Sequence, residues 1–186
     1  MTTFTKLRDI FSTNWTTVLA GWTGLGALSP WPERWIQFPS LLSPEEVGAY
    51  AEERLVTASG PAEKALIVDL LSLDLRSEPR PVVLDILKRL SDLDGADPGL
   101  QLRKWRLMLL ENLLQDLPQD PIEGLNTLTE FWQNFGFPLD SPHEVRGRGN
   151  SISPYEYYQS ENLVRLLKNH WEWVEDERER LRKLDA

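Results

Sequence analysis

The sequence predicts an all-α protein, and three observations lead to this class. Apolar residues recur at spacings of three and four along most of the chain, proline and glycine mark the starts and ends of these segments, and no segment sustains the alternation of a strand. At 186 residues the chain can bury a core without disulfides or metal. We therefore expect one helical domain over residues 1–186, with about seven helices in a layered array or short solenoid and a long ordered loop before the last helices.

Residues 1–42 are expected to form a short helix followed by a segment rich in tryptophan and proline. The run from Asn14 to Gly24 places apolar side chains at helical spacing, with Asn14 as N-cap and Gly24 as the stop. Residues 25–42 contain three prolines and are expected to be irregular. Packing against the core is favoured over ligand binding for the aromatic residues of this segment, which are Trp31, Trp35 and Phe38.

Residues 43–135 are expected to form the helical array. Ser43 and Glu46 match a capping box, and later prolines and glycines restart the helix at intervals of about twenty residues. The run QLRKWRLMLLENLLQDL is apolar over a wide face and is expected to be the central helix. Its cluster of Arg103, Lys104 and Arg106 is expected to lie on a solvated face.

Residues 136–159, called the hook below, interrupt the helical pattern. The hook contains a basic Gly-rich run and a second capping box, Ser153 to Glu156, that predicts a short helix. Tyrosine and arginine are enriched at binding hot spots, so the hook is a candidate recognition surface, although it could instead be a packing element. The candidate contact residues are Asp140, Glu144, Arg146, Arg148, Tyr155 and Tyr157. The arginines could also cradle an anion, but neutralisation of local carboxylates explains them more simply.

Residues 160–186 are expected to form a last helix whose first half docks on the core. Beyond Val174 the run EDERERLRK is charged on nearly every side and is expected to project into water, supported by pairs such as Asp176–Arg180 and Glu179–Lys183. A short coiled-coil contact through Leu181 and Leu184 is the alternative.

Few residues suit catalysis or metal binding. The only histidines are His143 and His170, and together with Asp140 and Glu144 they are a weak candidate for a metal site. A polar loop histidine and a histidine satisfied by an internal hydrogen bond are favoured instead. The sequence contains no nucleophile elbow, no zinc-protease motif and no nucleotide fingerprint, so we expect no cofactor and no enzyme activity.

Charge and composition limit the partners. The formal net charge is -9, which disfavours nucleic acid and favours a basic protein partner, unless the acidity serves only solubility. The chain has no cysteine and no apolar run long enough for a signal peptide or membrane span. We expect a cytoplasmic protein that binds no membrane. The sequence does not indicate whether it is a monomer or an oligomer.

Several stretches together resemble a known family. They are NWTTVLAGW, LSPEEVGAYAEERL, RKWRLMLLENLL, the hook with its flanks, and HWEWVEDE. This combination covers most of the chain and resembles the bacterial family catalogued as domain of unknown function 2247. The resemblance implies a small, cytoplasmic, mainly helical protein without assigned activity, of the sort seen beside immunity proteins of bacterial toxin systems. It implies no catalytic residues.

The first functional hypothesis is therefore a non-enzymatic immunity-type protein that neutralises a cognate, basic bacterial toxin. A helical adaptor or self-associating scaffold that uses a Trp-rich face is the alternative. A metal-dependent enzyme centred on His143 and His170 is the third hypothesis.

Overall fold

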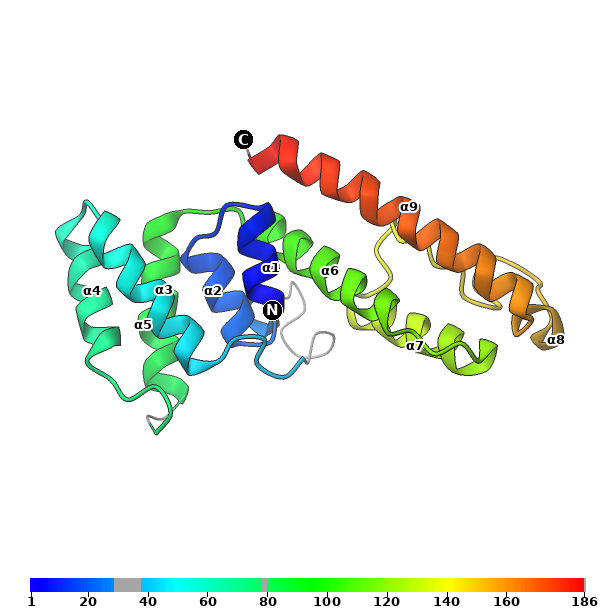
Figure 1. Cartoon of the computed structure of the whole chain (residues 1–186), viewed down its shortest axis with the longest axis horizontal. Helices are drawn as coiled ribbons and strands as arrows, with labels where there is room; N and C mark the ends of the chain where they lie inside the picture. Colours follow the sequence, from blue (N-terminus) through cyan, green and yellow to red (C-terminus); the bar gives the residue numbers. More distant parts are fainter. Residues whose placement is uncertain (29–37, 78–79, 186) are drawn as a thin grey trace. The chain divides into compact units, whose positions relative to one another are not determined.

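The computed structural model describes residues 1–28, 38–77 and 80–185. These residues form nine α-helices and one 3-10 helix without a strand, which confirms the all-α prediction for the described chain (Figure 1). The chain divides into two compact units, and the boundary falls between Trp105 and Arg106. Unit 1 contains the described residues up to 105, and unit 2 contains residues 106–185. The expectation of one domain over the whole chain stays a prediction.

Unit 1 is built from consecutive helices that pack on their neighbours. Helix α3 contacts α4, α4 contacts α5, and α2 lies against α5 (Figure 1). Its elements are α1 (Thr3–Ile10), α2 (Trp15–Trp22), η1 (Gly26–Leu28), α3 (Pro44–Thr57), α4 (Pro61–Leu71), α5 (Arg80–Asp94) and the first part of α6 (Pro98–Gln115). This succession of helices matches the expected array.

Two of the predicted helix starts are confirmed by capping boxes. The Ser43 hydroxyl accepts from the Glu46 N–H at 3.2 Å, while the Glu46 carboxylate accepts from the Ser43 N–H at 2.8 Å. Asn14 caps α2 in the same reciprocal way with Thr17. Helix α1 was not predicted, because its two turns bury only Phe4 and Leu7 and therefore leave little periodic signal in the sequence.

The core of unit 1 surrounds α2, all eight of whose residues are buried. The Trp105 indole N–H donates to the carbonyl of Thr17 at 3.0 Å, and the Phe4 ring stacks on Trp105 with centroids 6.1 Å apart. Gly24, the predicted stop, has φ +58° and follows the C-cap of α2. Of the aromatics expected in the irregular segment, Phe38 is half-buried, and Trp31 and Trp35 lie outside the described residues.

Unit 2 is built from the rest of α6, α7 (Pro121–Asn134), α8 (Pro154–Tyr157) and α9 (Ser160–Asp185). Helix α7 packs against α9, and α8 is the short helix predicted from the second capping box. The apolar face expected for α7 is confirmed, because Leu125, Leu128, Phe131 and Trp132 are all buried.

The prediction that the basic cluster of the central helix lies on a solvated face is wrong. Residues 104–108 of α6 are all buried, so the long basic side chains there find internal partners. The Lys104 ammonium donates to the Ser12 carbonyl at 2.9 Å and lies over the Phe11 ring. Arg106 is also buried, and its contacts form part of the site described below.

The charged second half of α9 is only partly directed to water. The Asp176–Arg180 and Glu179–Lys183 ion pairs are present, as predicted. Glu177 and Leu181 are nevertheless fully buried, whereas Leu184 is exposed. The charged run therefore has one buried face. This face was not predictable from composition, because it includes the charged residue Glu177.

Candidate functional site: the hook and its polar anchor

The hook is fastened to unit 2 by two arginine–carboxylate pairs. Arg106 of α6 donates to Asp140 at 2.7 Å, and Arg165 of α9 forms a two-pronged pair with Glu144 at 2.9 and 2.8 Å. The Arg165 hydrogen bonds lower the pKa of Glu144 below its ordinary value. Two of the six predicted contact residues thus have internal partners that hold the loop in place.

Tyr157 also holds the hook from inside. Its side chain is only 2% exposed, and its hydroxyl donates to the Glu144 carbonyl at 3.0 Å. The neighbouring Tyr158 hydroxyl donates to Asn126 of α7 at 3.1 Å. Burial therefore excludes Tyr157 from direct contact with a partner in this conformation, contrary to the expectation from sequence.

Four exposed residues of the hook, Leu139, Arg146, Arg148 and Tyr155, are called its outward face below, and Tyr155 is 79% exposed. The anchoring carboxylates Asp140 and Glu144 are also partly exposed, at 41% and 45%. Three residues of the outward face were predicted as contact residues. Leu139 was not, and its exposure is seen only in the structure.

Arg106 is the centre of a buried polar cluster that was not predicted from the sequence. Its guanidinium lies against a pair of indole rings that pack edge to face with centroids 5.3 Å apart, and it is 5.7 Å from the centroid of Trp132 and 5.1 Å from that of Trp173. Its Nη2 is 3.7 Å from the carboxylate of the fully buried Glu177. Cation–π contact and charge pairing together compensate for the desolvation of the guanidinium.

The two histidines lie together behind the hook, with ring centroids 5.5 Å apart. His170 accepts from the Trp132 indole N–H at 2.9 Å through Nε2, and its Nδ1 is 2.6 Å from the Leu166 carbonyl. This satisfied histidine was predicted. His143 is a buried loop residue: its Nε2 is 2.9 Å from the Thr129 hydroxyl, and its Nδ1 has no hydrogen-bond partner within the described part of the chain.

This arrangement does not favour the metal hypothesis. Both ring nitrogens of His170 are hydrogen-bonded, and Asp140 and Glu144 are paired with arginines. Among residues 1–28, 38–77 and 80–185, no three His, Asp or Glu side chains are grouped so that they could hold a metal ion.

We expect the stability of unit 2 to fall with acidification below about pH 6.5. Burial lowers the pKa of His143 to about 3 and that of His170 to about 4, so both are neutral when folded at a pH where the unfolded chain binds protons. The contribution of the two neutral histidines to the free energy of unfolding is complete above pH 6.5. It is lost as the pH falls toward about 4, the pKa of His170, and then toward about 3, the pKa of His143. By pH 5 the loss should be on the order of 2–4 kcal/mol.

Urea titrations followed by hydrogen exchange in α7 and α9 would measure this loss. A His170→Gln variant should have a shallower pH dependence in the same window. Unit 1 contains no histidine and provides the internal control. If the free energy of unfolding of the variant depended on pH as steeply as that of wild type, His170 would not be a source of the acid sensitivity.

The hook also encloses a pocket of about 270 Å³. Its lining includes Phe137, Leu139, His143, Glu144 and Arg148. The Arg148 guanidinium carbon lies 4.6 Å from the centroid of the Phe137 ring. Two backbone N–H groups of the basic Gly-rich run are already bonded within the loop, since that of Gly147 donates to Asn150 and that of Arg148 donates to the Val145 carbonyl.

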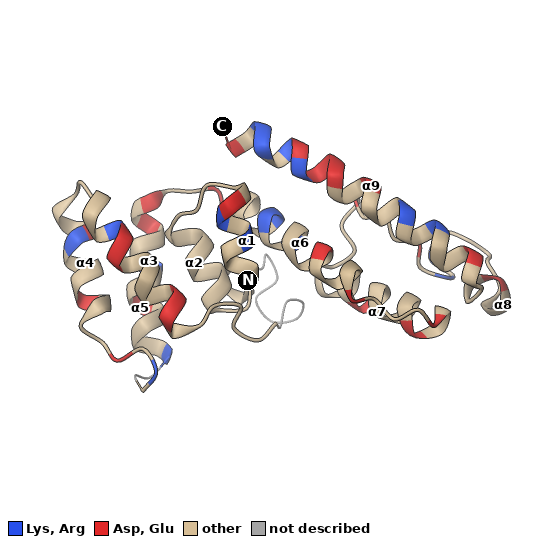
Figure 2. Ribbon diagram, in the orientation of Figure 1, with Lys and Arg blue, Asp and Glu red and all other residues tan. Residues whose placement is uncertain are grey.

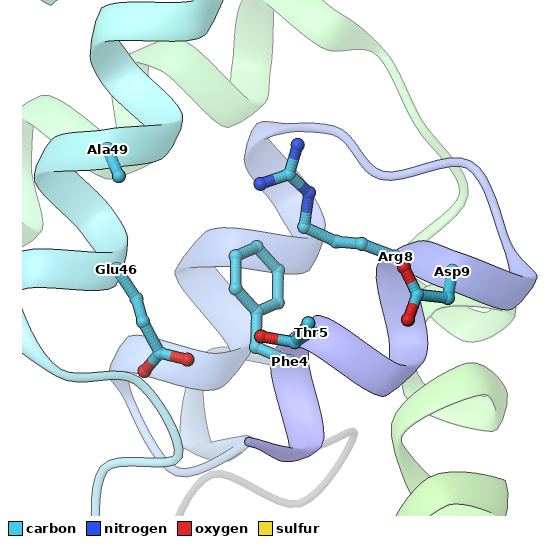
Figure 3. Close-up of a pocket in the computed structure, with 6 residues that line it drawn as sticks. All are labelled: Phe4, Thr5, Arg8, Asp9, Glu46 and Ala49. Carbon is cyan, nitrogen blue, oxygen red and sulfur yellow. The ribbon is translucent and has the colours of Figure 1, made fainter. Parts of the chain in front are cut away.

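Unit 1 has a pocket of about 330 Å³ between α1 and α3 (Figure 3). Its Arg8 pairs with Glu53 at 2.6 Å and lies over the rings of Phe4 and Tyr50. Glu46 belongs to the capping box of α3, in which Ser43 is the N-cap. Since its main charged groups already serve the fold, this pocket is a weaker candidate than the hook.

The described tryptophans do not form an exposed face. Five of the six are buried and the sixth, Trp171, is half-buried. The adaptor hypothesis, which relies on a Trp-rich face, therefore gains no support from them. Charges of both signs follow α9 (Figure 2), and within the described ranges no helix has the length and apolar character needed to cross a bilayer.

Comparison with known proteins agrees with the resemblance seen in the sequence. The family model described as "Uncharacterized protein conserved in bacteria (DUF2247)" matches residues 6–178. The chain belongs to this family. The DUF2247 match includes the whole hook and both Arg106 and Arg165, which anchor it. No curated protein and no solved structure is detectably similar to the chain.

Proposed function

We propose that this DUF2247 protein is a non-enzymatic, immunity-type binding protein that occludes a basic bacterial toxin with the outward face of its hook. One observation carries the proposal: a loop anchored by internal ion pairs directs leucine, tyrosine and two arginines to solvent. Tyrosine and arginine are the side chains that most often dominate binding energy.

The anchors of the hook favour tight binding. A loop that is already ordered loses less conformational entropy when a partner binds. Asp140, Glu144 and Tyr157 contribute in this way, since each ties the hook to unit 2 through its own hydrogen bond or ion pair. These three residues act as positioning residues for the outward face.

The net charge of the chain supports the choice of partner. A charge of -9 attracts a basic protein over long range and accelerates the encounter. The arginines of the hook act at short range, where they determine which groups of the partner can be accepted. A basic toxin and a locally basic contact loop are compatible because the two effects act at different distances.

Co-expression with the product of the adjacent gene, followed by co-purification and calorimetry, tests the proposal. Tyr155→Ala should weaken binding by about 30-fold, the loss expected for a hot-spot aromatic. Leu184→Ala removes a side chain that is likewise exposed, on α9, and should change the dissociation constant by less than about threefold. A neighbour that is not toxic, or a toxin that the protein neither binds nor neutralises, would contradict the proposal.

A further inference from the structure

We propose that the hook pocket receives a carboxylate carried by the bound protein, with Arg148 as the group that recognises it. The occupant is an aspartate or glutamate side chain whose apolar neighbour packs on Leu139. This inference rests on the proposed function and specifies the chemistry of its contact.

Arg148 is arranged to bind a planar anion. Its guanidinium carbon lies over the Phe137 ring, 4.6 Å from the centroid, and the side chain is exposed and has no ion-pair partner among the described residues. Its N–H groups are therefore not occupied by a carboxylate of that part of the chain, and a guanidinium can bind a carboxylate through two parallel hydrogen bonds.

The acidic group in the pocket wall does not compete for Arg148. Glu144 lines the pocket, but both of its oxygens accept from Arg165, at 2.9 and 2.8 Å. The other carboxylate of this loop, Asp140, is bound by Arg106. The positive charge of Arg148 is therefore available to a ligand.

The backbone at Phe137 supports a role for this stack. Phe137 has φ +49°, a left-handed conformation that is unfavourable for a bulky side chain. Its N–H donates to the Trp132 carbonyl at 2.9 Å, so the end of α7 holds the residue in this conformation. Strained backbone conformations cluster at functional sites. Here the strained residue is the one whose ring lies against Arg148.

The size of the pocket limits the occupant. Sites for drug-sized molecules span roughly 300–1,000 Å³, and this pocket is about 270 Å³. It accommodates one or two side chains of a partner rather than a nucleotide or a large cofactor.

The test is an NMR titration of the full chain with the ring signals of its two histidines as reporters. His143 lines the pocket, and His170, which does not and lies behind it with ring centroids 5.5 Å apart, should shift less. The probes are N-acetyl-Leu-Glu-amide, the neutral N-acetyl-Leu-Gln-amide and inorganic phosphate, at matched ionic strength. The Glu peptide should shift His143 saturably and bind about tenfold more tightly than the Gln peptide or phosphate.

Arg148→Gln should remove this preference, whereas Arg180→Gln, at an exposed site on α9, should retain it. Arg148 is exposed and has no ion pair within the described ranges, so its replacement, which removes the contact with Phe137, is expected to leave the fold intact. Equal binding of the two peptides, or of phosphate and the Glu peptide, would overturn the choice of a carboxylate.

The two proposals fail differently. If neither peptide shifts His143 while the neighbouring toxin still binds through Tyr155, the carboxylate inference is overturned and the proposed function stands. If the Glu peptide binds through Arg148 but no protein binds the hook, the proposed function fails and the carboxylate is not protein-borne.

Discussion

Replacing Arg106 with alanine should lower the free energy of unfolding of unit 2 by about 3–5 kcal/mol, the cost of removing one partner from a buried ion pair. The guanidinium packs beside Trp132 and Trp173 and pairs with Asp140, with the fully buried Glu177 nearby. Alanine leaves a void beside the two indoles and removes the cation next to a carboxylate that water cannot reach.

Hydrogen exchange in α7 and α9 under increasing urea measures this loss in unit 2. Arg180→Ala is the matched control, because Arg180 is 57% exposed and its ion pair with Asp176 is long, at 4.0 Å. The control should change stability by no more than about 0.5 kcal/mol. Similar effects for the two variants would show that the cluster does not stabilise unit 2 as inferred.

The Arg106 variant should also loosen the hook. Asp140 loses its anchor when the guanidinium is removed, whereas Glu144 keeps its pair with Arg165. Amide exchange near Asp140 should therefore accelerate more than exchange near Glu144. This difference separates a local release of the loop from general destabilisation.

Replacing Gly24 with alanine should destabilise unit 1 by on the order of 2–4 kcal/mol. Gly24 has φ +58°, and a Cβ there would overlap the carbonyl oxygen of Phe38 and approach that of Pro39 within 2.8 Å. Backbone atoms cannot move aside as a flexible side chain can, so the strained φ and the overlap both add to the cost.

Gly48→Ala is the matched control for this prediction. Gly48 lies within α3, and a Cβ added there meets nothing within 4 Å. Alanine is the better helix former, so the control should raise the free energy of unfolding by up to about 1 kcal/mol. Urea denaturation followed by exchange in α2 and α3 measures both variants, and a Gly24 variant as stable as wild type would contradict the packing described.

The helices were predictable where local signals determine them. Ser43, Asn14 and Ser153 each cap a helix through groups within three residues in the sequence, so the starts of α3, α2 and α8 could be read directly. The location of the hook was predictable for the same reason, since glycine and proline interrupt a helical pattern locally.

The buried polar contacts were not predictable from such signals. Arg106 meets Asp140 across 34 positions, and His143 meets Thr129 across 14. A helical pattern shows that a charged residue sits beside apolar ones, but only tertiary packing decides whether it faces water. Lys104, Arg106 and Glu177 were therefore assigned to the surface, and Tyr157 was expected to face a partner.

The fastening of the hook also has a consequence for biosynthesis. Arg165 follows the hook in the chain, so the second anchor of the hook is synthesised after the hook itself. The proposed recognition surface would be complete only when α9 has been synthesised and docked. A partner that selects this assembled state would in turn stabilise it through mass action, so that complex formation and completion of folding are thermodynamically linked.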